Sequence, residues 1–220
     1  LNDRQSAGSP EKAGKQRLLV VGNGMVGHHF IEQLVAAGGL ARFEVTVFGA
    51  EPDSAYDRVH LSEVFGGKAP EALRMADPAW YEESGIALRL GVEVEVLDRA
   101  ARTLTLANGE QFPYDRLVLA TGSVPFVPPI PGHQREGCFV YRTLGDLAAI
   151  RDACAQARSG VVIGGGLLGL EAANALRLLG LKTQVVEFAP RLMPVQLDES
   201  GGAVLRDKMQ ALGVEVLVEK

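Results

Sequence analysis

Two glycine-rich segments have the residue types and spacing of turns that bind the diphosphate of a dinucleotide. The first reads GNGMVG at residues 22–27 and the second reads GGGLLG at residues 164–169. In this GxGxxG pattern the first glycine permits a tight turn, the second lets the backbone approach the diphosphate, and the third lets a helix pack closely on a strand. Backbone N–H groups at the start of that helix then face the negative charge. The alternative is a pair of structural turns that hold no ligand.

The sequence around the first segment predicts a strand–turn–helix–strand unit. A short apolar run at residues 18–21 is typical of a buried parallel strand. An amphipathic stretch then predicts a helix to about residue 37, with Gly38-Gly39 as its stop. Residues 43–48 predict the next strand, which completes a βαβ unit.

The same order of elements returns around the second segment. We expect a strand at residues 161–163, a helix to about residue 179 that stops at Gly180, and a strand at residues 183–187. A further helix at residues 198–212 and a strand at residues 214–218 follow. The fold class predicted is therefore α/β, with two Rossmann-like βαβ units and parallel sheets.

Between the two units the pattern changes to short strands separated by turn residues. We expect strands at residues 87–90, 93–97, 103–106 and 111–112, which together form a small antiparallel meander over the first unit. Before them come a loop at residues 49–67 and a short helix at residues 78–84. After them, residues 116–120 return to the buried parallel type and end in Thr121-Gly122.

Composition along the chain predicts three parts. Residues 1–16 are rich in Ser, Gly, Lys and Glu without an apolar period, and are predicted to be a disordered tail. Residues 17–140 form the first domain, which ends after a stiff connector with four prolines at residues 123–132. The second domain, residues 141–220, opens with Thr143 and Asp146 as a capping box for a helix to about residue 158.

Acidic residues near the strand ends could read the ribose of each dinucleotide. Glu187 lies 23 residues beyond Gly164 at the end of the second strand of its unit. A carboxylate there accepts from a ribose 2′-OH and repels a 2′-phosphate, which favours NADH over NADPH. Arg191 could reduce this preference by binding a 2′-phosphate. In the first unit Glu51 is displaced past the usual place, so it is a candidate for the adenosine ribose or a solvated loop carboxylate.

Charge and composition exclude several other classes. A net charge of −5 and a pI of about 5.5 argue against nucleic-acid binding. The longest apolar stretch, residues 161–170, is half the length of a membrane span and contains four glycines. Cys138 and Cys154 are too few for a disulfide scaffold or an Fe–S cluster, so no metal site is predicted and a cytoplasmic location fits.

Longer strings of the sequence resemble one family. Over residues 17–220 the chain resembles the amino-terminal part of the assimilatory NAD(P)H nitrite reductase large subunits, within the glutathione-reductase-like (pyridine nucleotide-disulfide oxidoreductase) superfamily. The resemblance is carried by VVGNGMVGHHF, AYDRVHLSEVF, LVLATGSVPFVPPIPG, CFVYRTLGDL, GVVIGGGLLGLEAANALRLLGL and VVEFAPRLMPVQLD. It implies an FAD/NAD(P)-binding fold in which the first segment holds FAD and the second holds NAD(P)H.

The resemblance also implies roles for individual residues. Arg58 and Ser62 resemble the Arg…Leu-Ser segment of rubredoxin-reductase-like enzymes, where the arginine helps neutralise the diphosphate; a solvated loop arginine is the alternative. Val94 is expected to meet the adenine through its backbone. The remaining FAD contacts that the resemblance implies are Gly22, Gly24, Met25, Val26, Gly27, Ala120, Thr121 and Gly122. The contacts implied for NAD(P)H are Gly164, Gly166, Leu168, Gly169 and Glu187. Glu171 is expected either near the nicotinamide or on the surface of its helix.

By the same resemblance the intact parent protein transfers a hydride from nicotinamide C4 to flavin N5 and passes electrons to an Fe–S cluster and a sirohaem that reduce nitrite to ammonia. Those metal centres lie outside this chain, so its partners are the missing carboxyl-terminal domains and a small subunit. The first domain is expected to lack its carboxyl-terminal return and the second to be truncated. No side-chain catalyst is assigned, because the cofactors carry the chemistry.

Three other functions are alternatives to this one. A flavin-dependent disulfide reductase needs a reactive cysteine beside the flavin, and no cysteine precedes Cys138. A ferredoxin or rubredoxin reductase of the same fold would deliver electrons to a separate carrier protein. A non-catalytic nucleotide-binding module that senses redox state is the alternative from another class.

Overall fold

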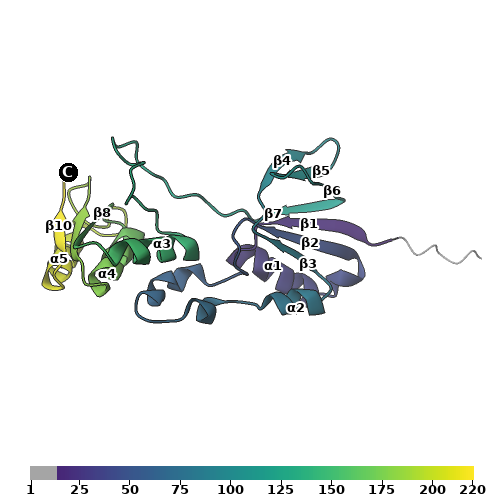
Figure 1. Ribbon diagram of the computed structural model, residues 1–220, viewed down its shortest axis with the longest axis horizontal. Helices are drawn as coiled ribbons and strands as arrows, with labels where there is room; N and C mark the ends of the chain where they lie inside the picture. Colours follow the sequence, from purple (N-terminus) through teal and green to yellow (C-terminus); the bar gives the residue numbers. More distant parts are fainter. Residues whose placement is uncertain (1–13) are drawn as a thin grey trace, which may run out of the picture. The chain divides into compact units, whose positions relative to one another are not determined.

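The computed structural model describes residues 14–220, and these residues divide into two units (Figure 1). The first unit comprises residues 14–56 with Met75–Gly122, and the second comprises Asp57–Arg74 with Ser123–Lys220. Residues 57–74 and 123–140 thus group with the second unit, whereas the predicted first domain, 17–140, included both. Residues 1–13 of the predicted tail, 1–16, lie outside the described residues. Gln16, the last residue of that predicted tail, is the first residue of a strand.

A parallel sheet of four strands forms the centre of the first unit within the described residues. Its strands run in the order β3-β2-β1-β7, and every neighbouring pair is parallel. Their bounds are β1 Gln16–Val21, β2 Phe43–Gly49, β3 Ala87–Leu90 and β7 Arg116–Leu119. Alternate residues of a strand point to opposite faces, so Leu18 and Val20 face one layer while Leu19 and Val21 face the other.

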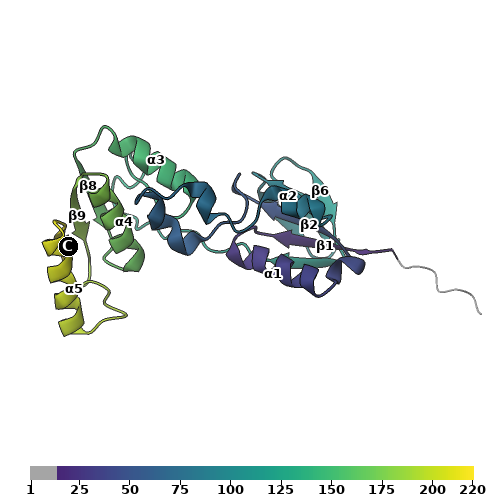
Figure 2. The ribbon, with the colours of Figure 1, turned by 90° about the horizontal axis from the view of Figure 1, so that it is seen from below.

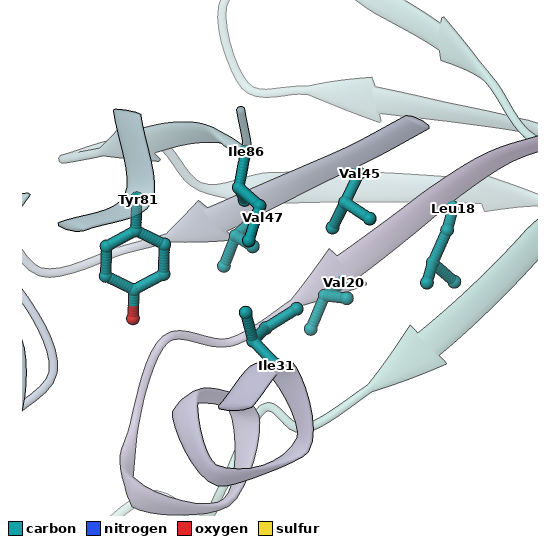
Figure 3. Close-up of a cluster of buried hydrophobic side chains, with 7 residues drawn as sticks. All are labelled: Leu18, Val20, Ile31, Val45, Val47, Tyr81 and Ile86. Atoms are coloured by element: carbon teal, nitrogen blue, oxygen red, sulfur yellow. The ribbon is translucent and has the colours of Figure 1, made fainter. Parts of the chain in front are cut away.

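Two helices cover the first face of this sheet (Figure 1). They are α1, Met25–Ala36, and α2, Pro78–Glu83, which begins at the side-chain cap of Asp77. Figure 3 shows the cluster that joins them to the strands, with Tyr81 of α2 near Val47 and Ile86 and with Ile31 of α1 near Val20. The cluster consists of Leu18, Val20, Ile31, Val45, Val47, Tyr81 and Ile86.

The antiparallel meander covers the opposite face, as predicted (Figure 1). Its strands are β4 Val94–Asp98, β5 Thr103–Leu106 and β6 Gln111–Pro113, in the order β4-β5-β6. The two fully buried leucines of β5 pack against Phe48 of the parallel sheet, and the rings of Phe48 and Phe112 lie 5.0 Å apart. The layer is therefore attached by apolar contacts rather than by strand pairing.

One strand of the predicted meander belongs to the parallel sheet instead. β3, at residues 87–90, pairs in parallel with β2 and not with β4. Parallel neighbours need a crossover connection, and α2 lies in the chain between β2 and β3. The prediction was wrong here because a four-residue apolar run does not by itself specify its sheet.

The second unit has its own parallel sheet, in the order β10-β9-β8 among the described strands. The strands are β8 Ser159–Ile163, β9 Lys182–Val186 and β10 Glu215–Leu217. Helices α4, Leu167–Leu178, and α5, Glu199–Ala211, lie beside this sheet (Figure 2), and Leu170, Ala173 and Met209 share one apolar cluster with Val185 and Val216. Both predicted βαβ units are therefore confirmed.

Helix α3, Leu144–Cys154, precedes this sheet, and the predicted capping box at its start is confirmed. The Thr143 hydroxyl accepts from Asp146 N–H, and the Asp146 carboxylate accepts from Thr143 N–H at 2.8 Å. The helix ends at Cys154 rather than near residue 158. The short 3₁₀ helices are η1 Gly39–Ala41, η2 Arg58–Val64 and η3 Pro70–Leu73, so the predicted loop at residues 49–67 contains η2.

We expect Leu104→Ala to lower the free energy of unfolding of the first unit by about 2–5 kcal/mol, because it leaves a cavity between the meander and the parallel sheet. Val96→Ala, on β4 and 51% exposed, is the matched control and is expected to change it by about 0.5 kcal/mol or less. Denaturant unfolding followed by the fluorescence of Trp80, the single tryptophan of the sequence, reports on this unit. Equal losses in the two variants would contradict this packing.

Candidate functional site

The first glycine turn (residues 22–27) lies between the end of β1 and the start of α1. Gly22 has a φ of 107°, a conformation that favours glycine, and a Cβ built on it would lie 2.1 Å from the Ala120 carbonyl oxygen. A Cβ on Gly27 would lie 2.0 Å from the carbonyl oxygen of Gly22. The first and third glycines are therefore required by the packing of the helix on the strands.

The second glycine turn (residues 164–169) repeats this geometry between β8 and α4 in the second unit. Gly164 has a φ of 111°, and a Cβ on Gly169 would lie 2.0 Å from the Gly164 carbonyl oxygen. The N–H of Gly164 donates to Val186 O at 2.8 Å, as that of Gly22 donates to Phe48 O at 2.8 Å. Both predicted turns therefore lie at strand-to-helix corners.

The middle glycines differ from the others, since neither packing within the chain nor a positive φ requires them. A Cβ built on Gly24 or Gly166 meets no atom of the described residues within 4 Å. Each is the N-cap of its helix, in extended conformation, and neither helix has a side-chain cap or an acidic residue in its first turn. The first N–H groups of both helices are thus left for an outside acceptor, and the space above them suits a diphosphate.

Apolar side chains border both turns. Val26 in the first turn of α1 is 73% exposed, and Leu168 in the first turn of α4 is 53% exposed, while Met25 is half-buried. Large apolar groups at this exposure offer surface to a flat ligand.

The structure brings the segment after β7 against the first glycine turn. Ala120 N–H donates to Val21 O at 2.7 Å, and the Ala120 carbonyl is the group that excludes a side chain at Gly22. Thr121 follows, and Gly122 has a φ of 70°. Two strand ends predicted to contact one nucleotide therefore do meet, and their contact with FAD stays a prediction.

Glu51 and Val94 lie near the same edge of the first sheet. The carboxylate of Glu51, two residues beyond β2, accepts from the Tyr56 hydroxyl at 2.6 Å, so it is not simply solvated. Val92 N–H donates to Gly49 O at 3.0 Å and leads into Val94, the first residue of β4. Both residues therefore follow closely on segments at the end of β2, and their roles toward the adenosine stay predictions.

Glu187 shapes the second glycine turn as well as lying where a ribose acid is expected. It follows the last residue of β9, and its two carboxylate oxygens accept from Gly165 N–H at 2.5 Å and from Ala189 N–H at 2.7 Å. The Arg191 guanidinium donates to Leu197 O and Pro194 O, so its hydrogen bonds hold the loop before α5. To bind a 2′-phosphate as predicted, Arg191 would have to give up these two hydrogen bonds.

Arg58 and Ser62 lie in η2, which groups with the second unit. The Arg58 guanidinium donates to the Arg142 carbonyl oxygen at 2.5 Å. It is therefore held by the backbone ahead of α3 rather than solvated. The predicted contact of these two residues with FAD stays a prediction.

Glu171 in α4 has a neighbour that the sequence did not single out. The hydroxyl of Tyr141 is buried without a hydrogen-bond partner in the described part of the chain, and its ring stacks on Phe65 at 6.2 Å. Burial, and then the negative charge of Glu171, raise the pKa of Tyr141 to about 12. Tyr141 therefore keeps its proton at neutral pH beside the acid predicted to lie near the nicotinamide.

Sequence reasoning also missed the side chains beneath the first glycine turn. The side-chain amide of Asn23 lies 2.8 Å from the Tyr81 hydroxyl, and that hydroxyl lies 2.7 Å from Nδ1 of His28. Tyr81 is 58 residues from Asn23 in the chain. No local sequence pattern could therefore have predicted that the two side chains meet.

Other kinds of site receive no support from residues 14–220. None of their helices combines the length and hydropathy that a membrane span requires. They also contain no group of three or more His, Cys, Asp or Glu side chains arranged to hold a metal ion. Cys138 and Cys154 are free thiols, both in the second unit.

Comparison with known proteins agrees with this geometry. The family model of the pyridine nucleotide-disulphide oxidoreductases matches residues 16–220. The nitrite reductase NAD(P)H large subunit of Klebsiella oxytoca is 56% identical over 206 residues, which are 94% of this chain and 22% of that protein. The chain thus spans less than a quarter of the length of this relative, and the predicted resemblance to these large subunits is confirmed.

Two solved structures of similar fold are reductases by their names. The NAD-dependent persulfide reductase of A. fulgidus has a TM-score of 0.86 at 27% identity, covering 92% of this chain and 39% of that one. The NADH:rubredoxin oxidoreductase of Clostridium acetobutylicum has a TM-score of 0.82 at 25% identity, covering 94% of this chain and 53% of that one. With two open glycine turns and a family match along its described length, the chain belongs to the pyridine nucleotide-disulphide oxidoreductase family.

Proposed function

We propose that the chain binds FAD at the first glycine turn and NAD(P)H at the second, as the hydride-accepting part of a larger nitrite reductase. The observation that carries this proposal is the open space at Gly24 and Gly166, where nothing else in the described chain requires a glycine. When bound, the nicotinamide and the flavin supply the redox chemistry, and the chain's residues bind and orient them.

The assignment of FAD to the first turn rests on the second strand end that meets it. Ala120–Gly122 give the first turn a second stretch of close backbone, which an extended dinucleotide can follow. The second turn is instead bordered by Glu187, a carboxylate suited to a ribose 2′-OH. NADH is therefore the nucleotide favoured there.

The parent protein is proposed to reduce nitrite, which is the reaction named for the Klebsiella oxytoca relative. The Fe–S cluster and sirohaem, the missing carboxyl-terminal domains, the small subunit and the cytoplasmic location all belong to this proposal. A reductase for a separate carrier protein is the second candidate, because the fold also matches the NADH:rubredoxin oxidoreductase. The parent's reading frame separates the two, since four cysteines with cluster spacing after residue 220 favour nitrite reductase.

A direct test adds FAD and then NADH to the purified chain without oxygen. Binding of FAD followed by bleaching of its visible absorption supports hydride transfer by this chain. Binding without bleaching would support a nucleotide-binding role only. The same titration on the full-length parent then shows whether the remaining chain restores transfer.

We expect Gly24→Ala to leave the fold intact and to weaken FAD binding by about tenfold or more, because its Cβ enters the space kept for the diphosphate. Its cost to folding should stay below about 1 kcal/mol, the usual range for a changed N-cap. Gly27→Ala is the contrast, since its Cβ meets backbone and should destabilise the unit by about 3 kcal/mol. Flavin fluorescence quenching and thermal unfolding measure the two effects, and unchanged affinity in Gly24→Ala would contradict the assignment.

We expect Glu187→Gln to shift the ratio of NADPH to NADH affinity toward NADPH by about fivefold, because the repulsion of a 2′-phosphate by one partly exposed charge is removed. Glu187→Ala should narrow the preference in the same way and also weaken binding of both nucleotides, since Gly165 N–H loses its acceptor. Glu199→Ala, at the start of α5, is the control. Titration with both nucleotides gives the ratios, and an identical ratio in all four proteins would remove the role of Glu187.

A further inference from the structure

Four side chains beneath the first glycine turn form a continuous polar line through an apolar region. Asn23 Oδ1 lies 2.8 Å from the Tyr81 hydroxyl, which lies 2.7 Å from His28 Nδ1. On the other side of the imidazole, Nε2 lies 3.5 Å from Oε1 of Glu32, whose side chain is 45% exposed. Tyr81 and His28 are 0% and 1% exposed, so the line joins a residue of the turn to a surface carboxylate (Figure 3 shows Tyr81).

Counting donors shows that one direction of hydrogen bonding leaves this line incomplete. A tyrosine hydroxyl has one hydrogen, so if it donates to Asn23 Oδ1 it must accept from Nδ1–H of His28. A neutral His28 then presents the lone pair of Nε2 to the Glu32 carboxylate. In that arrangement Asn23 Nδ2 and His28 Nε2 are both buried without a partner among the described residues. Each such group is unfavourable, because it loses its hydrogen bonds to water on burial without gaining others.

The opposite direction gives both of these nitrogens an acceptor. The oxygen and nitrogen of an amide are interchangeable in position, and the tautomer of a histidine follows from its neighbours. With the amide turned over, Asn23 Nδ2 donates to the Tyr81 oxygen, the Tyr81 hydroxyl donates to Nδ1 of His28, and Nε2–H donates to Glu32. Asn23, Tyr81 and His28 then each donate to the next side chain while His28 is neutral, and the amide oxygen of Asn23 takes the position that has no partner among the described residues.

The charges around His28 agree with a neutral ring. Burial is the largest effect and lowers its pKa; Glu32 acts to raise it and His29 to lower it further. From α2, the ring of Trp80 approaches edge-on at 5.4 Å, and burial raises the pKa of Tyr81 to about 12. Above pH 6.5 the imidazole is therefore neutral in both folded and unfolded chain, and protonation below that pH favours the unfolded chain.

We propose that Tyr81 and His28 are positioning residues of the first glycine turn, joined in a relay that runs from Asn23 through Tyr81 and His28 to Glu32. Asn23 lies between the two glycines that shape the entry to α1, so fixing its amide fixes the backbone that faces the diphosphate. The relay holds the turn in its ligand-binding conformation from below, while the ligand side stays open at Gly24. This inference deepens the proposed function of the same site and rests on it for the identity of the ligand.

The relay has a spectroscopic test that needs no ligand. In ¹⁵N-labelled chain at pH 7.5, His28 is expected as the neutral tautomer with its proton on Nε2. Tyr81→Phe should move the amide resonances of Gly22, Gly24 and Gly27, because it cuts the tie to Asn23 while keeping the ring. Tyr114→Phe, which changes another buried tyrosine of this unit, is the control and should leave them in place. A proton on Nδ1, or turn amides unmoved by Tyr81→Phe, would overturn the relay.

The second arm measures FAD affinity at a temperature where each variant is fully folded. Tyr81→Phe should weaken FAD binding about five- to tenfold, and adding His28→Gln should cost little more, because both substitutions break the same relay. The FAD affinity of the unsubstituted chain should fall as the pH drops through the pKa of His28, which burial lowers below 6.5, whereas the affinity of Tyr81→Phe should change less. Additive losses, or a loss as large in Tyr114→Phe, would overturn the relay. If the unsubstituted chain binds no FAD, the proposed function fails, and the resonance test alone decides whether the relay exists.

Discussion

The whole arrangement depends on how closely each helix approaches the strand before it. The carbonyl oxygens of Gly22 and Gly164 occupy the space where a side chain at Gly27 or Gly169 would lie, with built Cβ atoms only 2.0 Å away. This approach places the first N–H groups of α1 and α4 at the carboxyl ends of β1 and β8. The partial positive charge of a helix terminus is strongest within its first turn, so only this approach lets the strand edge and the helix terminus serve one anion.

The glycines of each turn therefore have separable causes. Packing explains Gly22, Gly27 and Gly169, and a positive φ explains Gly164; both causes would hold equally in a protein that binds nothing. Gly24 and Gly166 have extended backbones and open surroundings, so neither conformation nor packing accounts for the missing side chain. Ser, Thr, Asp or Asn at the N-cap would stabilise each helix only slightly more than glycine does, by about a few tenths of a kcal/mol. The open space above both positions is therefore the structural reason to place a ligand there.

Local patterns allowed much of this fold to be predicted from the sequence. The two βαβ units and the capping box of Thr143 and Asp146 depend on residues within a few positions of each other. The pairing of β3 with β2 could not be predicted in this way, because a four-residue apolar strand has the same sequence pattern in a parallel sheet and in a meander. The same limit hid Tyr81 and Tyr141, whose hydroxyls acquire their surroundings only through contacts distant in the chain. At the candidate site the glycines could be predicted, and the groups that hold them in place could not.

The position after the first glycine shows that the two turns are held in different ways. Asn23 has a side chain there, tied to Tyr81 from α2. Gly165 has none, because a Cβ would lie 2.6 Å from Leu192 and 3.1 Å from Glu187, and its N–H and C=O are bound by Glu187 and Met193. In the second unit the acid that would read the ribose also holds the turn, so affinity and selectivity cannot vary independently. In the first unit the holding groups lie beneath the turn, which leaves its ligand face free to change without loss of its shape.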